Sequence, residues 1–190
     1  MPGVSAGEED ILAFSPTALE ALRPLTDLPF VIHLELDNPD QVLQQFRPFP
    51  ADTIIACLDT LPDPLRTLEH IRARQARPGL SLNPDEPFSK AAPFLPHLDV
   101  LLLLGVFPGF GGQPMQAGAL HKIAEAAHWR NRLGLPLLIA VDGGVNQSNA
   151  PALIAAGADI LVVGTALFAA ADMRAVVEKL RGSAECPHLR

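Results

Sequence analysis

A carboxylate beside a glycine turn is the first candidate for chemistry in this sequence. The apolar residues up to Val141 are followed directly by Asp142, Gly143 and Gly144. Glycine lets a backbone approach a ligand closely and aim its N–H groups at it, and phosphate is the usual ligand of such groups. Asp142 would stand at the carboxyl end of a strand, where α/β proteins form their binding face. We therefore expect a site for an anionic substrate around this residue.

Two further glycine turns follow other apolar runs. The segment PGFGGQ at 108–113 follows the run 99–106, and Gly164-Thr165 follows the run 160–163. A merely structural turn is the alternative, since glycine is common in turns. Three such turns, each after a strand, instead favour a phosphate grip built from backbone donors. The candidate phosphate-binding residues are Gly109, Phe110, Gly111, Gly112, Gly143, Gly144, Gly164 and Thr165.

A second group of polar residues alternates along two apolar segments in the first half of the chain. His33 and Glu35 are two residues apart, and Cys57 and Asp59 repeat that spacing. Residues two apart on a strand face the same side, so the four side chains could stand together as nitrogen, oxygen and sulfur ligands. The alternative is that His33 is an interior histidine, whereas Glu35 and Asp59 point into solvent.

The elements that would position these residues alternate between strands and helices. We expect strands at 30–36, 53–58, 79–82, 99–106, 137–141 and 160–163. We expect helices at 15–23, 38–46, 65–75, 89–95, 117–133, 149–157 and 172–181. This alternation predicts an α/β fold with a parallel sheet. A closed barrel of this kind has eight strands and typically ~250 residues, so about two strand–helix units are missing at the front.

Length, charge and cysteine usage restrict the class of protein. The 190 residues fit one domain, 1–190, and 21 acids against 14 bases give a net charge of −7. This charge argues against binding to nucleic acid or to an anionic membrane surface. The apolar run 100–106 is too short to span a bilayer. Cys57 and Cys186 lie far apart and no charged apolar leader precedes the chain, so we expect a cytoplasmic protein.

The motifs taken together resemble those of the ribulose-phosphate 3-epimerase family. The resemblance lies in PGFGGQ at 108–113, VDGG at 141–144 and GTALF at 164–168, in that order, together with His33 in FVIHLELDNP. The segment LNPDEP at 82–87 is also similar to that family's LNPxTP turn. The resemblance extends from about Ser15 to Arg181.

The resemblance implies a fold, an activity and a set of site residues. It implies a (β/α)8 barrel that uses a divalent metal (Zn, Fe or Mn) to interconvert ribulose 5-phosphate and xylulose 5-phosphate in the pentose phosphate pathway. His33 and Asp142 match two metal ligands of the family, and Asp142 also matches an acid/base carboxylate. The three glycine turns match the loops that hold the phosphate of the sugar.

The sequence departs from the family pattern on the catalytic side. The family's first strand, with its serine, and its second strand, with an HxD pair, have no counterpart here. That pair supplies a further metal ligand and the second acid/base carboxylate, so the metal could be lost in this chain. The strand-three HLM motif of the family reads His33-Leu34-Glu35 here, so Glu35 replaces its methionine. Cys57 replaces the strand-four histidine, and Leu104 replaces a methionine that lines the sixth strand of the family.

Glu35 is the candidate for the missing second carboxylate. Epimerisation next to a carbonyl needs a base on one face of the carbon and an acid on the other. The third and seventh strands of an eight-stranded barrel lie on opposite sides, so Glu35 and Asp142 could approach a sugar from opposite faces. Glutamate is one methylene longer than aspartate, and a misplacement of about 1 Å can cost ~10²-fold in rate. We therefore expect weak or absent turnover.

Three alternatives stay open at this point. The chain could be an inactive phosphosugar-binding remnant, or a truncated product that needs a partner chain to close its barrel. A decarboxylase or synthase of the same superfamily would be expected to carry a lysine at a strand tip, whereas Lys90, Lys122 and Lys179 fall on helices. An open edge beside the segment FVIHLEL also predicts self-association into a homo-oligomer.

Overall fold

A parallel sheet of six strands organises the protein. The structure is a computed structural model that describes residues 16–37, 39–109 and 111–182. The strands are β1 (Val31–Leu34), β2 (Thr53–Cys57), β3 (Arg77–Leu82), β4 (Val100–Leu104), β5 (Leu138–Asp142) and β6 (Ile160–Val162). They lie side by side in the order of the sequence, and every neighbouring pair is parallel. This order requires a crossover after each strand, which is the pattern of a barrel wall.

Helices form the crossovers between the strands. The α-helices are α1 (Pro16–Leu22), α2 (Pro39–Leu43), α3 (Pro64–Ala73), α4 (Ala119–Leu133), α5 (Ala150–Ala156), α6 (Thr165–Phe168) and α7 (Met173–Gly182). The 3₁₀-helices are η1 (Arg23–Leu25), η2 (Leu58–Thr60), η3 (Phe88–Lys90) and η4 (Ala92–His97). No helix in the described part of the chain is both long enough and apolar enough to span a bilayer.

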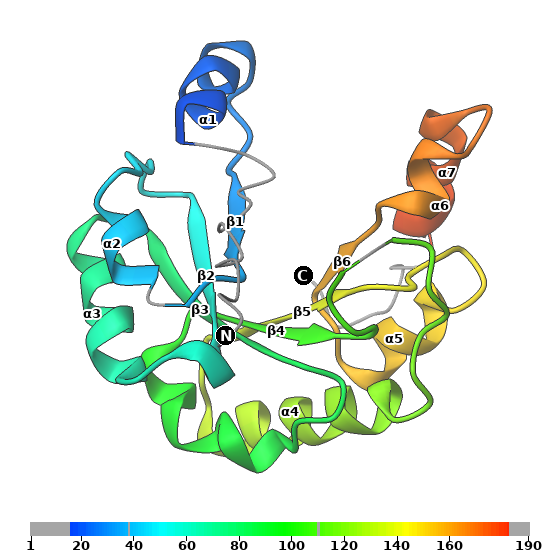
Figure 1. The fold of residues 1–190 in the computed structure, drawn as a ribbon. Coiled ribbons are helices and arrows are strands. Elements are labelled where there is room, and N and C mark those ends of the chain that lie inside the picture. The colour runs from blue at the N-terminus through cyan, green and yellow to red at the C-terminus, as the bar shows by residue number, and fades with distance from the viewer. Residues whose placement is uncertain (1–15, 38, 110, 183–190) are drawn as a thin grey trace, which may run out of the picture.

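The sheet curls into part of a barrel. Helices α2 to α5 lie along its outer side, and β1 and β6 stand apart on the two sides of an opening (Figure 1). Within the described ranges, β1 pairs only with β2 and β6 pairs only with β5. The expected (β/α)8-type barrel without its first two strands is confirmed as a six-stranded partial barrel.

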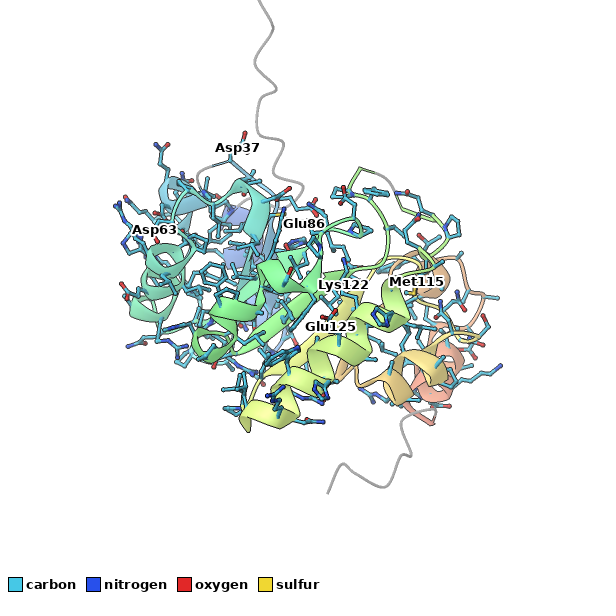
Figure 2. The ribbon with its side chains drawn as sticks, turned by 90° about the horizontal axis from the view of Figure 1, so that it is seen from below. Asp37, Asp63, Glu86, Met115, Lys122 and Glu125 are labelled. Carbon is cyan, nitrogen blue, oxygen red and sulfur yellow. The ribbon has the colours of Figure 1, made fainter. Side chains whose placement is uncertain are left out.

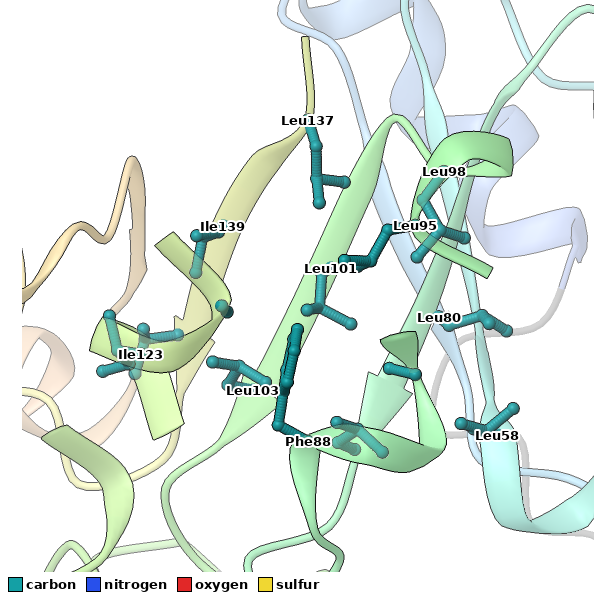
Figure 3. Packing of buried hydrophobic residues seen from close by; sticks show 14 of the residues in the cluster. Leu58, Leu80, Phe88, Leu95, Leu98, Leu101, Leu103, Ile123, Leu137 and Ile139 are labelled. Atoms are coloured by element: carbon teal, nitrogen blue, oxygen red, sulfur yellow. The ribbon is translucent and has the colours of Figure 1, made fainter. Parts of the chain in front are cut away.

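The core fills both faces of the sheet because side chains alternate along each strand. On the outer face, Leu80, Leu101 and Ile139 are fully buried in one cluster with Ile123 of α4 (Figure 3). A fully buried leucine or isoleucine contributes roughly 1.5–3 kcal/mol relative to an exposed one. The inner face carries a smaller apolar cluster, which includes Ile55, Val100, Leu102, Leu104 and Ala140. These two layers hold the strand ends in place.

The structure differs from the sequence prediction in two short segments. The helix expected at 89–95 is instead the pair η3 and η4, with Pro93 and Pro96 inside η4. Proline removes a backbone N–H and clashes with the carbonyl four residues earlier, so a regular α-helix does not form there. Helix α6 was not predicted, because four residues are too few to show helical periodicity.

Candidate active site

A cleft of about 490 Å³ opens at the carboxyl ends of the strands. The loops after β4, β5 and β6 form most of its wall, and Glu35 completes the wall from the end of β1. Every predicted phosphate-binding residue in the described ranges lines it, as do both predicted catalytic residues. Phe110, the remaining candidate, lies outside the described residues. The structure thus brings the three glycine turns and two carboxylates to one place.

Close packing between two loops explains two of the glycines. The loop after β4 lies directly on the turn after β5, and the Gly105 N–H donates to the carbonyl oxygen of Asp142 at 2.6 Å. Gly143 and Gly144 have φ angles of +94° and +72°. A side chain at Gly144 would also place its Cβ 2.6 Å from the backbone nitrogen of Met115. Only glycine fits this contact, which sets the position of Asp142.

Gly109 and Gly164, one in each of the other two turns, face open space. A Cβ at Gly164 would have no neighbour within 4 Å, and the φ angle there is negative. A Cβ at Gly111 would lie 3.1 Å from the Thr165 hydroxyl, so the loop after β4 approaches the start of α6. No neighbouring atom would clash with a side chain at position 164, and the φ angle there is not in the left-handed region that favours glycine. A site that leaves room for a ligand against the backbone accounts for this glycine.

Asp142 ends β5 on the inner side of the partial barrel. In the parallel register it stands between Leu104 of β4 and Val162 of β6. Burial raises the pKa of the Asp142 carboxyl above its ordinary value, and a hydrogen bond from the Gly143 backbone partly opposes this rise. A carboxyl group with a raised pKa is a stronger base when it is ionised than an ordinary carboxylate.

Glu35 faces Asp142 from the other side of the cleft. Its side chain is 43% exposed, yet it lines the cleft and does not simply point into bulk solvent. Burial raises the pKa of Glu35, and the negative charges of Asp142 and Asp59 raise it further. The charge of Asp142 therefore acts on Glu35 across the cleft.

His33 lies behind Glu35 on the inner face of the sheet. Its Nε2 atom is 2.9 Å from the Ser81 hydroxyl, and its Nδ1 atom is 3.6 Å from Glu35 Oε1. Burial lowers the pKa of His33 to about 4, so the imidazole is neutral at neutral pH. The ring links the end of β3 to the carboxylate at the end of β1.

A second group of hydrogen-bonded polar residues lies at the ends of β2 and β3. The Cys57 thiol donates to Asp59 Oδ1 at 3.0 Å, and Asn83 Nδ2 donates to Asp59 Oδ2 at 2.9 Å. Burial raises the pKa of Cys57 to about 12, so the sulfur remains a thiol. The sequence reasoning missed Ser81 and Asn83, although they repeat on β3 the two-residue spacing of the polar pairs on β1 and β2.

Comparison with known proteins identifies the family to which this site belongs. The model of the ribulose-phosphate 3 epimerase family matches residues 10–168. The ribulose-phosphate 3-epimerase of Bacillus subtilis (strain 168) is 37% identical over 173 residues, which cover 90% of this chain and 80% of that protein. The enzyme of the same name from Rhodospirillum rubrum is 39% identical over 174 residues, which cover 92% of this chain and 76% of that protein. The chain belongs to the ribulose-phosphate 3-epimerase family.

Solved structures share the fold of this family member. The structure of KGPDC from Streptococcus mutans matches with a TM-score of 0.66 at 13% identity, over 88% of this chain and 77% of that one. The 3-hexulose-6-phosphate synthase from Salmonella typhimurium matches with a TM-score of 0.62 at 15% identity, over 89% and 79% of the two chains. At these identities the likeness concerns the fold alone.

The described residues do not supply a complete set of ligands for the metal that the resemblance implies. Within residues 16–37, 39–109 and 111–182, no group of three or more His, Cys, Asp and Glu side chains could hold a metal ion. The predicted ligand His33 has its Nε2 atom in contact with Ser81, and Cys57 and Asp59 bond to each other. The described residues therefore do not fit a metal site by themselves, and His33 and Asp142 as ligands stay a prediction.

Lys122 approaches the end of β3 from a helix. It lies in the first turns of α4, and its Nζ atom donates to the carbonyl oxygens of Asn83 and Pro84 at 2.7 and 2.9 Å (Figure 2). Burial lowers the pKa of Lys122, and the charges of Glu86 and other nearby acids oppose that change. Because its donors face backbone carbonyls, this lysine holds the turn after β3 in position.

Proposed function

We propose that the chain interconverts ribulose 5-phosphate and xylulose 5-phosphate by transferring a proton at C3. The observation that carries this proposal is the placement of Glu35 and Asp142 on one cleft, each with a raised pKa, beside three glycine turns. Membership of the ribulose-phosphate 3-epimerase family supports the same reaction. Glu35 and Asp142 are the proposed catalytic residues.

The two carboxyl groups divide the reaction between them. The ionised one removes the proton from C3, and the electron pair of that C–H bond moves to form a double bond between C3 and C2. The C2 carbonyl then becomes an enediolate oxygen. The protonated carboxyl donates its proton to C3 from the other face, and the carbonyl re-forms with the opposite configuration. The two groups have then exchanged their proton, which prepares the site for the reverse reaction.

The pKa shifts suit this division of roles. Two carboxyl groups that share a site do not both ionise easily, because the first negative charge opposes the second. Burial raises the pKa of both carboxyl groups, and the charge of Asp142 adds to the rise at Glu35, so each group keeps its proton to a higher pH than an exposed carboxyl does. The scheme requires the state in which one of the two groups is protonated, because that state supplies a base and an acid at the same time. No step in this scheme is assigned to a metal ion.

The glycine turns are the proposed phosphate grip. The described candidates are Gly109, Gly111, Gly112, Gly143, Gly144, Gly164 and Thr165. Backbone N–H donors hold a dianion without a lysine or arginine, which suits a chain with a net charge of −7. Phe110 belongs to the same proposed set by its place in the PGFGGQ segment. The grip lies on the loops after β4, β5 and β6, so it uses no residue of β1.

A phosphosugar-binding protein without catalytic activity is the less favoured alternative. Such a protein would not need a second carboxylate opposite Asp142, whereas Glu35 occupies that place and has a raised pKa. Slow turnover is still expected, because the side chain of Glu35 is one methylene longer than the aspartate of the family and places its carboxylate differently. We further propose a cytoplasmic protein that assembles with copies of itself.

The conversion of ribulose 5-phosphate tests the proposed function. We expect NMR spectra of ribulose 5-phosphate incubated with the purified chain to show xylulose 5-phosphate. The Asp142→Asn variant serves as the negative control, since it keeps the shape of the side chain and removes its proton chemistry. Absence of conversion by the wild type, with and without added Zn²⁺, Fe²⁺ or Mn²⁺, would contradict an epimerase.

A further inference from the structure

A buried hydroxyl lies at the centre of the polar network behind the cleft. Ser81 is fully buried in β3, among strands whose other inner residues are mostly apolar. Burying a hydroxyl without a hydrogen-bond partner costs free energy, so the partner of such a group shows what the group does. Here the partner is His33 Nε2, at 2.9 Å. The Cys57 sulfur also lies beside this hydroxyl, but sulfur is a weak acceptor, so the imidazole nitrogen is the stronger partner.

The contact joins two strands that are not neighbours. Strand β2 lies between β1 and β3, with Ile55 opposite His33 and Cys57 opposite Ser81 in the register. The imidazole must therefore reach across β2 to meet the hydroxyl. A ring held at its far end in this way has little freedom to rotate about its side-chain bonds.

The two nitrogen atoms of the ring have opposite roles in this arrangement. A neutral imidazole carries one N–H, and its other nitrogen accepts a hydrogen bond. Nδ1 lies 3.6 Å from Glu35 Oε1, and an ionised carboxylate can only accept. The proton therefore belongs on Nδ1, which leaves Nε2 to accept from the Ser81 O–H. The opposite tautomer would direct a nitrogen lone pair at the carboxylate oxygen.

We infer that Ser81 is a positioning residue, which fixes the orientation of the His33 ring so that Nδ1 faces Glu35 and, through this ring, fixes the place of the Glu35 carboxylate in the cleft. The hydroxyl is not part of the cleft wall. Ser81 acts on Glu35 through its hydrogen bond to His33 and through the imidazole ring of that residue. This role differs from metal ligation by His33, because the nitrogen that bonds to Ser81 is not available to a metal at the same time.

The tautomer of His33 gives a direct test that needs no activity. Nitrogen-15 NMR of the imidazole at pH 8 should place the proton on Nδ1 in the wild-type chain. Ser81→Ala removes the hydroxyl with little change of shape, so the ring can turn away from Glu35, and we then expect a mixture of tautomers. A Thr67→Val control removes another buried hydroxyl, which bonds to Asp40 on the outer helices, and should leave the His33 signals unchanged. A wild-type ring protonated on Nε2, or identical spectra for wild type and Ser81→Ala, would overturn the inference.

The kinetic test rests on the proposed function as well. We expect kcat of Ser81→Ala for ribulose 5-phosphate to fall by roughly tenfold to a hundredfold, because a misplaced carboxylate loses rate steeply. KM should change by less than about twofold, since the phosphate grip is untouched. Ser81→Cys keeps a weak hydrogen-bond donor, so its kcat should lie between that of the wild type and that of Ser81→Ala. The kcat of Thr67→Val should equal that of the wild type.

The NMR and kinetic measurements together distinguish the positioning role of Ser81 from the proposed epimerase function. A changed KM with kcat unchanged in Ser81→Ala would overturn the positioning role. A tautomer shift in Ser81→Ala, combined with no turnover in any protein, would contradict the proposed function and support the positioning of the ring. Should Ser81→Ala prove too unstable to study, the comparison of wild type with Ser81→Cys supplies both readouts.

Discussion

The negative charge of Asp142 raises the pKa of Glu35, although β2, β3 and β4 lie between the strands that carry them. The sheet curls into part of a barrel (Figure 1), and this curl brings Glu35 and Asp142 to the wall of one cleft. A flat sheet with the same strand order would keep the two carboxylates far apart. The shape of the sheet therefore creates the paired site.

The raised pKa of Asp142 predicts that the residue lowers stability at neutral pH. A carboxyl whose pKa is higher in the folded state favours folding while it is protonated. That contribution disappears as the pH rises from the ordinary carboxyl value through the raised one. Asp142→Asn removes the burial of a charge, so its melting temperature at pH 7 should exceed that of the wild type by a few degrees, on the order of 2–4 °C per 1 kcal/mol. Thermal unfolding followed by circular dichroism measures this.

The pH dependence supplies the control for that prediction. The gain in Asp142→Asn should shrink at low pH, where the wild-type carboxyl is protonated in both states. Asp172→Asn serves as a matched variant, since its exposed carboxylate caps the start of α7. Asparagine also caps a helix, so this variant loses only the favourable charge at the start of α7, and its melting temperature should change little. A constant difference between Asp142→Asn and wild type from pH 4 to pH 8 would contradict the burial of a charge.

Gly164→Ala should weaken phosphate binding because its methyl group would fill space beside the cleft. A Cβ at this position meets no protein atom within 4 Å, so the methyl group would occupy ligand space. We expect the affinity for ribulose 5-phosphate and for inorganic phosphate to fall about tenfold or more, which corresponds to ~1.4 kcal/mol. Calorimetric titration measures it. Gly118→Ala, also surrounded by open space but before α4, is the control and should bind like wild type.

The buried carboxylate Asp52 should matter more for stability than the charged residues on the surface. It accepts two hydrogen bonds from Arg23, at 2.7 and 2.6 Å, and one each from the backbone N–H groups of Phe30 and Phe49. Arg23 also stacks on both aromatic rings. Removing one partner of a buried pair typically costs about 3–5 kcal/mol, so Asp52→Ala should lower the free energy of unfolding by that amount.

An exposed ion pair gives the reference value for this prediction. Asp99 lies 3.8 Å from Arg72 at a more exposed position. Pairs of this kind are worth about 0–1 kcal/mol, so Asp99→Ala should change the free energy of unfolding little. Urea denaturation of the three proteins compares them directly. Similar losses in Asp52→Ala and Asp99→Ala would contradict the structural role given to Asp52.

The exposed apolar residues next to β1 predict self-association. Leu25 and Leu28, which precede β1 in the chain, are 78% and 71% exposed, and Val31 in β1 is 53% exposed. An apolar strand edge is a surface on which another chain can pair. Sedimentation should show a species larger than the 20.3 kDa monomer at micromolar concentration. Leu28→Glu should shift it toward monomer, whereas Leu133→Glu, at the end of α4, should not. A wild-type monomer would refute this prediction.

The strands and the glycine turns were predictable because their signals are local. Apolar runs such as 100–104 end in glycine, and parallel strands bring their carboxyl ends to one side, so the cleft followed from the order of the motifs. The position of Glu35 was also predictable from the two-residue spacing with His33. Both inferences need only periodicity and topology.

The hydrogen-bond network behind the cleft was not predictable to the same extent. Whether Cys57 and Asp59 bond to each other or bind a metal depends on side-chain rotamers and on distances between strands, which spacing does not define. Ser81 was overlooked because a single serine in an apolar strand has no pattern of its own. Its partner His33 lies two strands away, and only the register of the folded sheet reveals that contact.

Isotope exchange at C3 of ribulose 5-phosphate tests most directly whether Glu35 and Asp142 form the proton-transfer pair. The substrate is incubated in D₂O with the wild-type chain, Glu35→Gln or Asp142→Asn, and deuterium at C3 is followed by NMR. Zn²⁺, Fe²⁺ or Mn²⁺ is added in parallel samples. The account predicts exchange with the wild type and its loss in both variants, while phosphate affinity stays within about twofold. Exchange that continues unchanged in Glu35→Gln would contradict the pair.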